Sequence, residues 1–353
     1  MFLLRFDMRA PSHGAATASD LYAAAIEMAA WGERNGAIQL AVSEHHGSED
    51  GYLPAPLLLA AAMAGRTERI PILVAALILP LHDPIELAEQ MAVLDLASGG
   101  RVSYVTAVGY RRAEYEQFGR DFGSRGKRME ACLQALRQAF TGEPFRFEGR
   151  RVQVTPAPAT PGGPALFMGG NSAAAARRAA RFEMGLYAQG LDPELGDLYA
   201  AECRRLGREP GLCINPPADT VTSAFVARDP DRAWAEMGPY LLHDAQAYAA
   251  WMGDVEVSVS KSTATSVDAL RAQNGPYRIF TPDEAIAHIR ENGLLLLQPL
   301  CGGLPPELAW PSLELLASEV LPAVRDASSG AEPPSTGRTP MLRPRRPPSE
   351  VVS

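Results

Sequence analysis

The sequence predicts an α/β fold, a (β/α)8 TIM barrel with insertions. Short apolar runs alternate with longer segments of helical period along most of the chain, which is typical of repeated strand–helix units. Residues 70–79 are almost entirely apolar, as expected of a parallel strand that is buried on both faces. The turn after the first apolar run, residues 9–14, lacks the Gly-x-Gly-x-x-Gly pattern of a doubly wound dinucleotide-binding sheet.

Eight apolar runs are the expected barrel strands. They cover residues 2–8, 37–42, 70–79, 101–108, 165–168, 185–188, 221–227 and 294–298. Segments of helical period cover residues 19–35, 54–65, 83–99, 124–140, 172–182, 194–206, 230–251, 282–291 and 311–324. Ser19 is the expected N-cap of the first helix, and Asp83 followed by Pro84 marks the start of the third.

Three stretches depart from this alternation. Residues 145–154 alternate around a glycine and predict a β-hairpin. Residues 253–275 are polar and irregular, so we expect a lid or substrate loop there. Residues 327–353 are rich in Pro, Ser and Arg and poor in apolar side chains, which predicts a disordered tail behind a single barrel domain of residues 1–326.

Composition excludes several classes of protein. The net charge of −8 argues against a nucleic-acid binder, which normally presents a basic face. The four cysteines have neither disulfide-framework nor zinc-ligand spacing and indicate reduced core residues. No apolar stretch approaches the roughly 20 residues of a membrane span, and no signal peptide is recognisable. We therefore expect a cytoplasmic enzyme with no membrane partner.

Polar residues follow three of the expected strands, at the carboxyl edge where parallel α/β folds build their sites. Ser43-Glu44-His45-His46 follows the second strand, and its imidazoles titrate near neutral pH. Gly109-Tyr110 follows the fourth strand. Gly169-Gly170-Asn171-Ser172 follows the fifth and precedes a helix, whose amino-terminal N–H groups attract anions. An ordinary capped loop would also explain this last segment.

Together these segments resemble the bacterial luciferase-like flavin monooxygenase family. The likeness extends over most of residues 1–325. It is carried, in order, by Ser43-Glu44-His45-His46, Val74–Pro80 with His82-Asp83-Pro84, Leu94–Arg101, Gly109-Tyr110 with Glu114-Tyr115, and Met168–Ser172. The resemblance implies the luciferase-like barrel and an oxidoreductase that uses reduced FMN and dioxygen on a small organic substrate.

The resemblance also implies roles for individual residues. His45 is the expected catalytic acid or base near the flavin, and Glu44 is expected to orient it. The expected cofactor-binding residues are Ala75, Ala76, Ala107, Gly109, Tyr110, Gly170, Asn171 and Ser172. Among these, Ala75 and Ala76 are expected to be joined by a cis peptide, and the last three to lie near the FMN phosphate. His46 and His82 are weaker candidates for lining the pocket.

Partners follow from the same resemblance. The chain has no candidate NAD(P)H domain, so we expect a separate NAD(P)H:flavin reductase to supply reduced FMN. Family members commonly form dimers through helices beside the early strands, and a homodimer is expected here.

Alternatives remain open at this point. Luciferase carries an arginine where this chain has Val108, and Arg111 or Arg112 could replace it as a phosphate ligand. A deazaflavin coenzyme used for hydride transfer is therefore the second interpretation. A third is a non-catalytic flavin-binding partner subunit. A metal-dependent hydrolase using Glu44, His45 and His46 is disfavoured, and no metal is expected, because neighbouring residues on a strand point to opposite faces.

Overall fold

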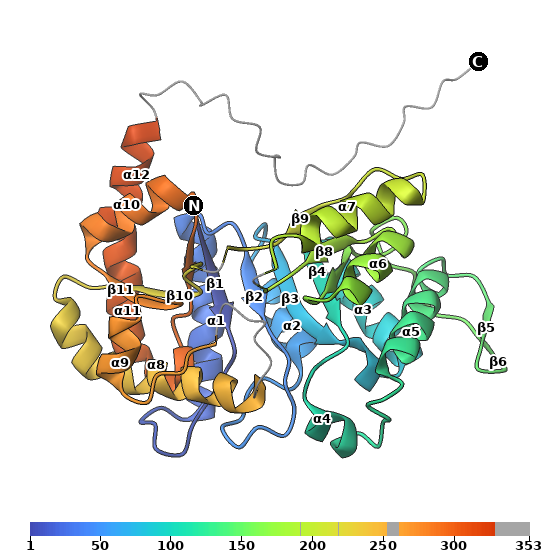
Figure 1. Ribbon diagram of the computed structural model, residues 1–353, viewed down its shortest axis with the longest axis horizontal. Coiled ribbons are helices and arrows are strands. Elements are labelled where there is room, and N and C mark those ends of the chain that lie inside the picture. The colour runs from blue at the N-terminus through green and yellow to red at the C-terminus, as the bar shows by residue number, and fades with distance from the viewer. Residues whose placement is uncertain (191, 218, 253–260, 329–353) are drawn as a thin grey trace.

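The computed structural model describes residues 1–190, 192–217, 219–252 and 261–328 (Figure 1). Within them, ten strands form one sheet in the order β11-β10-β12-β1-β2-β3-β4-β7-β8-β9, and every pair in it is parallel. The strands are β1 (Phe2–Phe6), β2 (Leu40–Val42), β3 (Ile72–Ile78), β4 (Val102–Ala107), β7 (Leu166–Gly169), β8 (Gly185–Tyr187), β9 (Cys213–Ile214), β10 (Ser223–Val226), β11 (Tyr277–Phe280) and β12 (Leu295–Leu297). A separate antiparallel hairpin pairs β5 (Phe145–Phe147) with β6 (Arg150–Val152).

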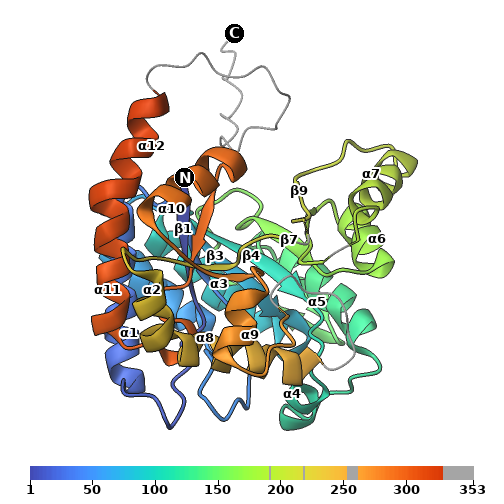
Figure 2. The same ribbon diagram turned by 60° about the vertical axis from the view of Figure 1, so that its left-hand side comes forward.

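Helices cover the outside of this sheet (Figure 2). They are α1 (Ala18–Asn35), α2 (Pro56–Arg66), α3 (Pro84–Ser98), α4 (Arg112–Gln117), α5 (Arg125–Ala139), α6 (Ala173–Arg181), α7 (Leu195–Arg205), α8 (Pro230–Met252), α9 (Val267–Ala272), α10 (Pro282–Asn292), α11 (Pro306–Leu315) and α12 (Leu321–Ser328). Short 3-10 turns η1 (Leu79–Leu81) and η2 (Cys301–Gly303) and the π-helical turn η3 (Leu316–Val320) complete the described elements. None of these helices combines the length and apolar character that crossing a membrane requires.

The first strand lies beside the last one, as barrel closure requires. β1 pairs with β12 on one side and with β2 on the other, so the first and last strands of the sequence are hydrogen-bonded neighbours. The ladder ends at β9 and β11, which are not hydrogen-bonded to each other in the described residues. In Figure 1 the amino terminus lies at the upper end of the sheet, and α4 and α8 lie at the lower end.

All eight predicted strands are present, and the sequence missed two. β9 is only two residues long, and β11 has a mixed sequence, Tyr-Arg-Ile-Phe, with no extended apolar run. The predicted hairpin is confirmed by β5 and β6. The last predicted helix begins earlier, at Pro306, and α12 continues to Ser328, past the expected domain end at 326. The predicted irregular loop, residues 253–275, contains the short helix α9 (Val267–Ala272), which Ser266 caps. Predicted tail residues 329–353, and 253–260 of the predicted loop, lie outside the described residues.

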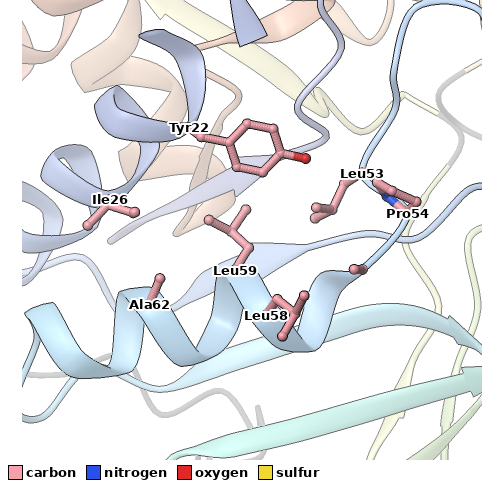
Figure 3. Close-up of a pocket in the computed structure, with 8 residues that line it drawn as sticks. Tyr22, Ile26, Leu53, Pro54, Leu58, Leu59 and Ala62 are labelled. Carbon is pink, nitrogen blue, oxygen red and sulfur yellow. The ribbon is translucent and has the colours of Figure 1, made fainter. Parts of the chain in front are cut away.

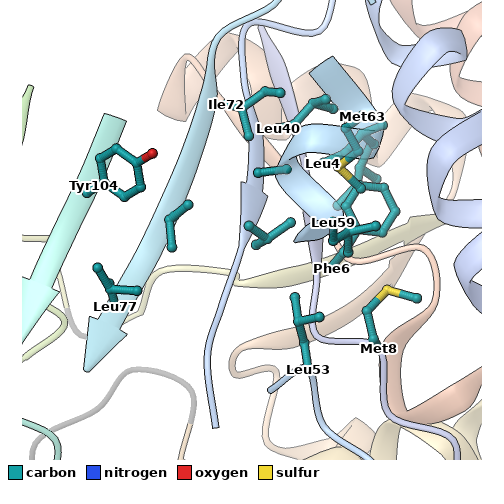
Figure 4. Packing of buried hydrophobic residues seen from close by; sticks show 14 of the residues in the cluster. Leu4, Phe6, Met8, Leu40, Leu53, Leu59, Met63, Ile72, Leu77 and Tyr104 are labelled. Atoms are coloured by element: carbon teal, nitrogen blue, oxygen red, sulfur yellow. The ribbon is translucent and has the colours of Figure 1, made fainter. Parts of the chain in front are cut away.

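Successive side chains along a strand point to opposite faces of the sheet, so apolar residues form two separate cores, one on each face. Leu4, Phe6 and Met8 point outward into the large cluster between the sheet and the helices, where Ile72 joins them (Figure 4). Leu73, Val105 and Phe167 form a separate, smaller cluster on the opposite face of the sheet. The second cluster therefore marks the interior of the barrel.

Helix caps fix where the main helices begin. Thr17, and not the expected Ser19, caps α1: its hydroxyl accepts from the Asp20 N–H while the Asp20 carboxylate accepts from the Thr17 N–H. Asp83 caps α3 as predicted, accepting from the Ile85 N–H at 2.8 Å.

Candidate functional site

His45 lies directly beyond the carboxyl end of β2 and is held by a carboxylate from α4. Its Nδ1 is 2.8 Å from Oε1 of Glu114, and its backbone N–H donates to the Leu53 carbonyl. The Glu114 side chain is fully buried and also accepts from the His46 N–H at 3.0 Å. His45 is only 7% exposed, so this bond fixes the ring in a protected environment.

The other ring nitrogen of His45 faces a phenol. Nε2 lies 3.2 Å from the hydroxyl of Tyr110, which is 38% exposed and therefore reaches the surface of the site. The rings of Tyr52 and Trp251 pack against the imidazole at centroid distances of 4.8 and 4.7 Å. Glu114, His45 and Tyr110 thus form a continuous hydrogen-bonded chain from a fully buried carboxylate to a partly exposed tyrosine.

Burial and the charges around the hydrogen-bonded series Glu114–His45–Tyr110 favour a neutral His45 imidazole. Burial lowers the pKa of His45, and the positive charges of Arg111 and Arg9 act in the same direction, against the raising effect of Glu114. Burial works against ionisation of Glu114, but its hydrogen bonds with His45 and the His46 N–H and the charges of His45 and Arg111 together outweigh this and lower the pKa of that carboxyl. An ionised Glu114 requires the proton on Nδ1, so Nε2 is left to accept from Tyr110.

The Glu44 carboxylate is not hydrogen-bonded to the His45 ring in the described residues, so the structure offers no contact for the expected orienting role. Its Oε1 lies 2.9 Å from Nε2 of His46 and 2.7 Å from Nε2 of His82, and its other oxygen accepts from the Ile78 N–H. Burial opposes the charge of Glu44, but the two histidines outweigh it and lower the pKa of Glu44 to about 2. The carboxylate therefore ties the β2 loop to the end of β3.

The neighbouring imidazoles of His45 and His46 serve different carboxylates, as the alternation of a strand predicts. Glu44, His46 and His82 bring ligand-type atoms within 4.8 Å of one another. Hydrogen bonds to Glu44 account for both of these histidines. His45, the third residue expected of a hydrolase site, is hydrogen-bonded to Glu114 and Tyr110 instead.

Small residues of β3 and β4 border open space at the strand ends. Ala75 and Ala76 are joined by a cis peptide, as the resemblance implies, and are the two partly exposed residues of an otherwise buried strand. Ala107, at the end of β4, is also partly exposed. At the following Gly109 (φ 69°), an added Cβ would lie 2.8 Å from Ile78, so only glycine fits.

The glycine turn after β7 leads into the amino terminus of α6. Ser172 caps this helix by accepting from the Ala175 N–H, and Asn171 accepts from the Gln189 N–H at 2.7 Å. Gly170 has a φ of 141°, a conformation that side-chain-bearing residues rarely adopt. Since β2 and β7 belong to one parallel sheet, His45 and this turn lie at the same end of the barrel.

A buried ionic cluster beside His45 was missed by the sequence analysis. Arg9 is fully buried; its Nε donates to Asp244 at 2.8 Å and its Nη1 donates to Asp50. The guanidinium carbon also lies 4.7 Å from the Tyr52 ring and 4.3 Å from the Trp251 ring. The alternation Arg5-Phe6-Asp7-Met8-Arg9 was the available signal, because it places every charge on one face.

Neither arginine proposed as a replacement phosphate ligand is at the glycine turn. Arg111 donates to the His46 carbonyl at 2.9 Å and to Glu114 at 3.0 Å, and it stacks on Trp251. Arg112 lies over the ring of Phe122. Arg111 therefore helps to hold Glu114, the carboxylate that is hydrogen-bonded to His45.

Comparison with known proteins assigns the family. The sequence pattern described as luciferase-like monooxygenase matches residues 2–291. The chain belongs to the luciferase-like monooxygenase family. Its fold agrees: a monooxygenase from Streptomyces bottropensis superposes with a TM-score of 0.72 at 20% identity, covering 92% of this chain and 99% of that one.

Two further relatives of this luciferase-like chain are informative. The oxygenating constituent of 3,6-diketocamphane monooxygenase of Pseudomonas putida, in complex with FMN, has a TM-score of 0.65 at 18% identity and covers 90% of this chain and 99% of that one. The oxygenase component of the flavin-dependent trigonelline monooxygenase of Acinetobacter baylyi is 30% identical over 129 residues, 36% of each chain.

The first curated relatives match over only part of their length. A Mycobacterium tuberculosis (strain H37Rv) protein is 33% identical over 159 residues, 44% of this chain and 54% of that protein. The chain thus spans about half the length of this relative.

The diketocamphane monooxygenase constituent is in complex with FMN, and the residues of this luciferase-like chain fit that cofactor. Ala75, Ala76 and Ala107 have no bulk beyond Cβ where they border open space, which suits a flat aromatic ring system. At Gly169 an added Cβ would come within 2.8 Å of Val105, so the turn already packs closely on the interior cluster. The amino terminus of α6 offers N–H groups to a phosphate.

Proposed function

We propose that this chain is the oxygenase of a two-component flavin-dependent monooxygenase, which uses reduced FMN and dioxygen on a small organic substrate. The strongest support is the hydrogen-bonded series Glu114–His45–Tyr110. It lies at the same end of the barrel as the Gly170–Ser172 turn. Reduced FMN supplies the electrons that activate dioxygen. The protein must then supply binding, orientation and proton transfer.

His45 is the proposed acid–base residue. Its neutral ring has Nε2 unprotonated, so it can take a proton and return it later in the cycle. Glu114 holds the ring through Nδ1 and stabilises the imidazolium that forms when Nε2 is protonated. Tyr110 is the partly exposed end of this hydrogen-bonded chain, and its hydroxyl is the proposed link between His45 and the substrate.

The proposed flavin site combines two parts. Ala75, Ala76, Ala107 and Gly109 lie against the ring system, and Gly170, Asn171 and Ser172 lie at the phosphate. Glu44 supports the first part indirectly, because its carboxylate holds the Ile78 N–H just beyond the two alanines. The charge of the phosphate is balanced by the amino terminus of α6.

Anaerobic titration of the purified protein tests the proposal. We expect reduced FMN to change the flavin absorption spectrum with saturable binding, and reduced deazaflavin to bind at least tenfold more weakly. Product should then require dioxygen. Tight binding of deazaflavin with anaerobic hydride transfer would support the second interpretation instead, and binding of neither coenzyme would overturn the proposal.

The proposed homodimer would use the outer faces of α2 and α3. These helices expose Leu58, Val93 and Leu96, at 74%, 53% and 45%. Leu58 borders an apolar groove of about 250 Å³ between α1 and α2, shown in Figure 3 with Tyr22 and Ile26 on its far side. Exposed apolar side chains on neighbouring helices are typical of subunit contacts.

A separate NAD(P)H:flavin reductase remains the proposed source of reduced FMN.

A further inference from the structure

Arg5 places a positive charge inside the barrel. Its neighbours on β1, Leu4 and Phe6, point into the outer core, so the Arg5 side chain lies on the opposite face. The strand register pairs Arg5 with Ala41 of β2, and Ala41 with Leu73 of β3. Leu73 belongs to the interior cluster, which places Arg5 in the same lining.

Apolar side chains line the barrel interior around Arg5, and the charges of Asp244 and Asp7 also act on it. The interior cluster contains Leu73, Val105 and Phe167, with Ala75, Ala76 and Tyr187 packed against it. The charge of Arg5 acts on Tyr187: burial raises the pKa of that phenol, and Arg5 partly opposes the rise. β1 and β8 are well separated in the strand order, so this interaction runs across the barrel interior.

Arg5 makes no hydrogen bond or ion pair with any residue that the structure describes. Its Nε is buried without an acceptor, and the side chain as a whole is partly exposed, so it borders open space. Arg9, two residues along, provides the contrast, because its Nε and Nη1 pair with Asp244 and Asp50. A guanidinium nitrogen that is buried without an acceptor has lost its hydrogen bond to water, which costs free energy unless a ligand replaces it.

The charges of two acids, Asp244 and Asp7, act on Arg5, but neither acid is hydrogen-bonded to it in the part of the chain that the structure describes. Asp7 accepts from Gln298 at 2.7 Å and from the Arg9 N–H at 3.3 Å, and it lies 3.5 Å from Nε of Arg9. Burial, reinforced by the neighbouring Asp244, raises the pKa of Asp7 to about 8. Asp7 is thus bonded to Gln298 and Arg9, and it leaves the buried Nε of Arg5 without an acceptor.

We propose that Arg5 is a ligand-binding residue that recognises a planar anion, one whose charge is shared between two acceptor atoms, inside the barrel. A guanidinium fork matches such a group bidentately. Two sources have this chemistry: the pyrimidine edge of reduced flavin, whose negative charge is shared by N1 and the C2 oxygen, and the carboxylate of an organic substrate. The first source rests on the proposed function and extends it to a residue that stabilises the reduced ring.

Binding measurements on Arg5→Gln and Arg5→Lys test this assignment. Arg146→Gln, an exposed position on the β5–β6 hairpin, is the matched control. Each protein is titrated anaerobically with reduced FMN, aerobically with oxidised FMN, and separately with benzoate and with benzamide. Circular dichroism and thermal melting show whether each variant is folded.

If the flavin is the source, Arg5→Gln weakens binding of reduced FMN at least tenfold and of oxidised FMN less than threefold. The absorption change that reports N1 protonation of the bound reduced flavin then moves to higher pH. Arg5→Lys restores part of the affinity, because it keeps the charge but loses the fork. The control behaves as wild type.

If a substrate carboxylate is the source, Arg5→Gln leaves both FMN affinities unchanged and weakens binding of benzoate, but not of benzamide, at least tenfold. A folded Arg5→Gln protein that binds all four probes as wild type does would overturn the assignment. Failure of the wild type to bind FMN in either redox state would refute the proposed function, while the benzoate comparison would still decide the role of Arg5.

Discussion

The carboxylate of Glu114 lies 2.8 Å from Nδ1 of His45, although the two residues are 69 positions apart in the sequence. This contact decides which nitrogen of the imidazole carries the proton and which one faces Tyr110. The acid–base role proposed for His45 therefore depends on α4, a helix that is absent from the segments predicted from the sequence.

Replacing Glu114 by Gln tests this contact. The carboxylate raises the pKa of His45, so its loss lowers that pKa further. We expect kcat/KM to fall about 10–100-fold, as for other lost orienting partners, and the acid limb of its pH profile to move to lower pH. Glu116→Gln, an exposed position on the same helix, is the control. An unmoved acid limb in a folded Glu114→Gln protein would contradict the orienting role.

Replacing Tyr110 by Phe removes the hydroxyl that donates to Nε2 of His45. Tyr110 is partly exposed, so we expect thermal stability to change little and kcat to fall about tenfold or more, within the range of a positioned proton-transfer group. Tyr22→Phe, on the outer face of α1, should leave kcat unchanged. Equal kcat values for Tyr110→Phe and wild type would remove Tyr110 from the proton path.

Replacing Glu44 by Gln should act on stability. The pKa of Glu44 is lowered to about 2, so its contribution is fully present above the pKa of the unfolded chain and is lost as pH falls toward 2. From that shift we expect Glu44→Gln to lower the free energy of unfolding at pH 7 by on the order of 3 kcal/mol. Urea unfolding between pH 3 and 7 measures this.

The difference between wild type and Glu44→Gln should shrink as pH is lowered below about 4.5, where the unfolded carboxyl takes up its proton. A difference that is small at pH 7, or that is independent of pH over this range, would show that the ion pairs with His46 and His82 do not stabilise the fold.

Replacing Leu58 by Glu tests the proposed dimer. A carboxylate placed on the exposed apolar face of α2 would have to be desolvated on association, which is unfavourable. Light scattering on a sizing column should show a dimer for wild type and a monomer for Leu58→Glu, with the same circular dichroism spectrum. Lys127→Glu on α5 is the surface control. A monomeric wild type at micromolar concentration would refute the dimer.

Much of the fold follows from local sequence. The apolar run of β3, the cap at Asp83 and the glycine turn before α6 each carry a signal within a few neighbouring residues. The sequence did not predict β9, which is only two residues long, or β11, which has no extended apolar run. Their pairing is decided by neighbours in the sheet, which periodicity along the chain does not encode.

The site was predictable in position but not in its contacts. His45 could be found because it follows a buried strand. Glu44 was the natural partner by proximity, yet the backbone turns its carboxylate toward His46 and His82. Glu114 follows β4 and meets His45, which follows β2, and only the pairing of these strands through β3 brings the two distant positions together.

The central claim is that His45 and the Gly170–Ser172 turn face one flavin. A crystal structure of the protein grown anaerobically with reduced FMN tests it most directly. We expect the ring between Ala75–Ala76 and His45, with the phosphate within hydrogen-bonding distance of the N–H groups at the start of α6. Flavin density that is absent from saturated crystals, or that lies away from both His45 and this turn, would contradict the account.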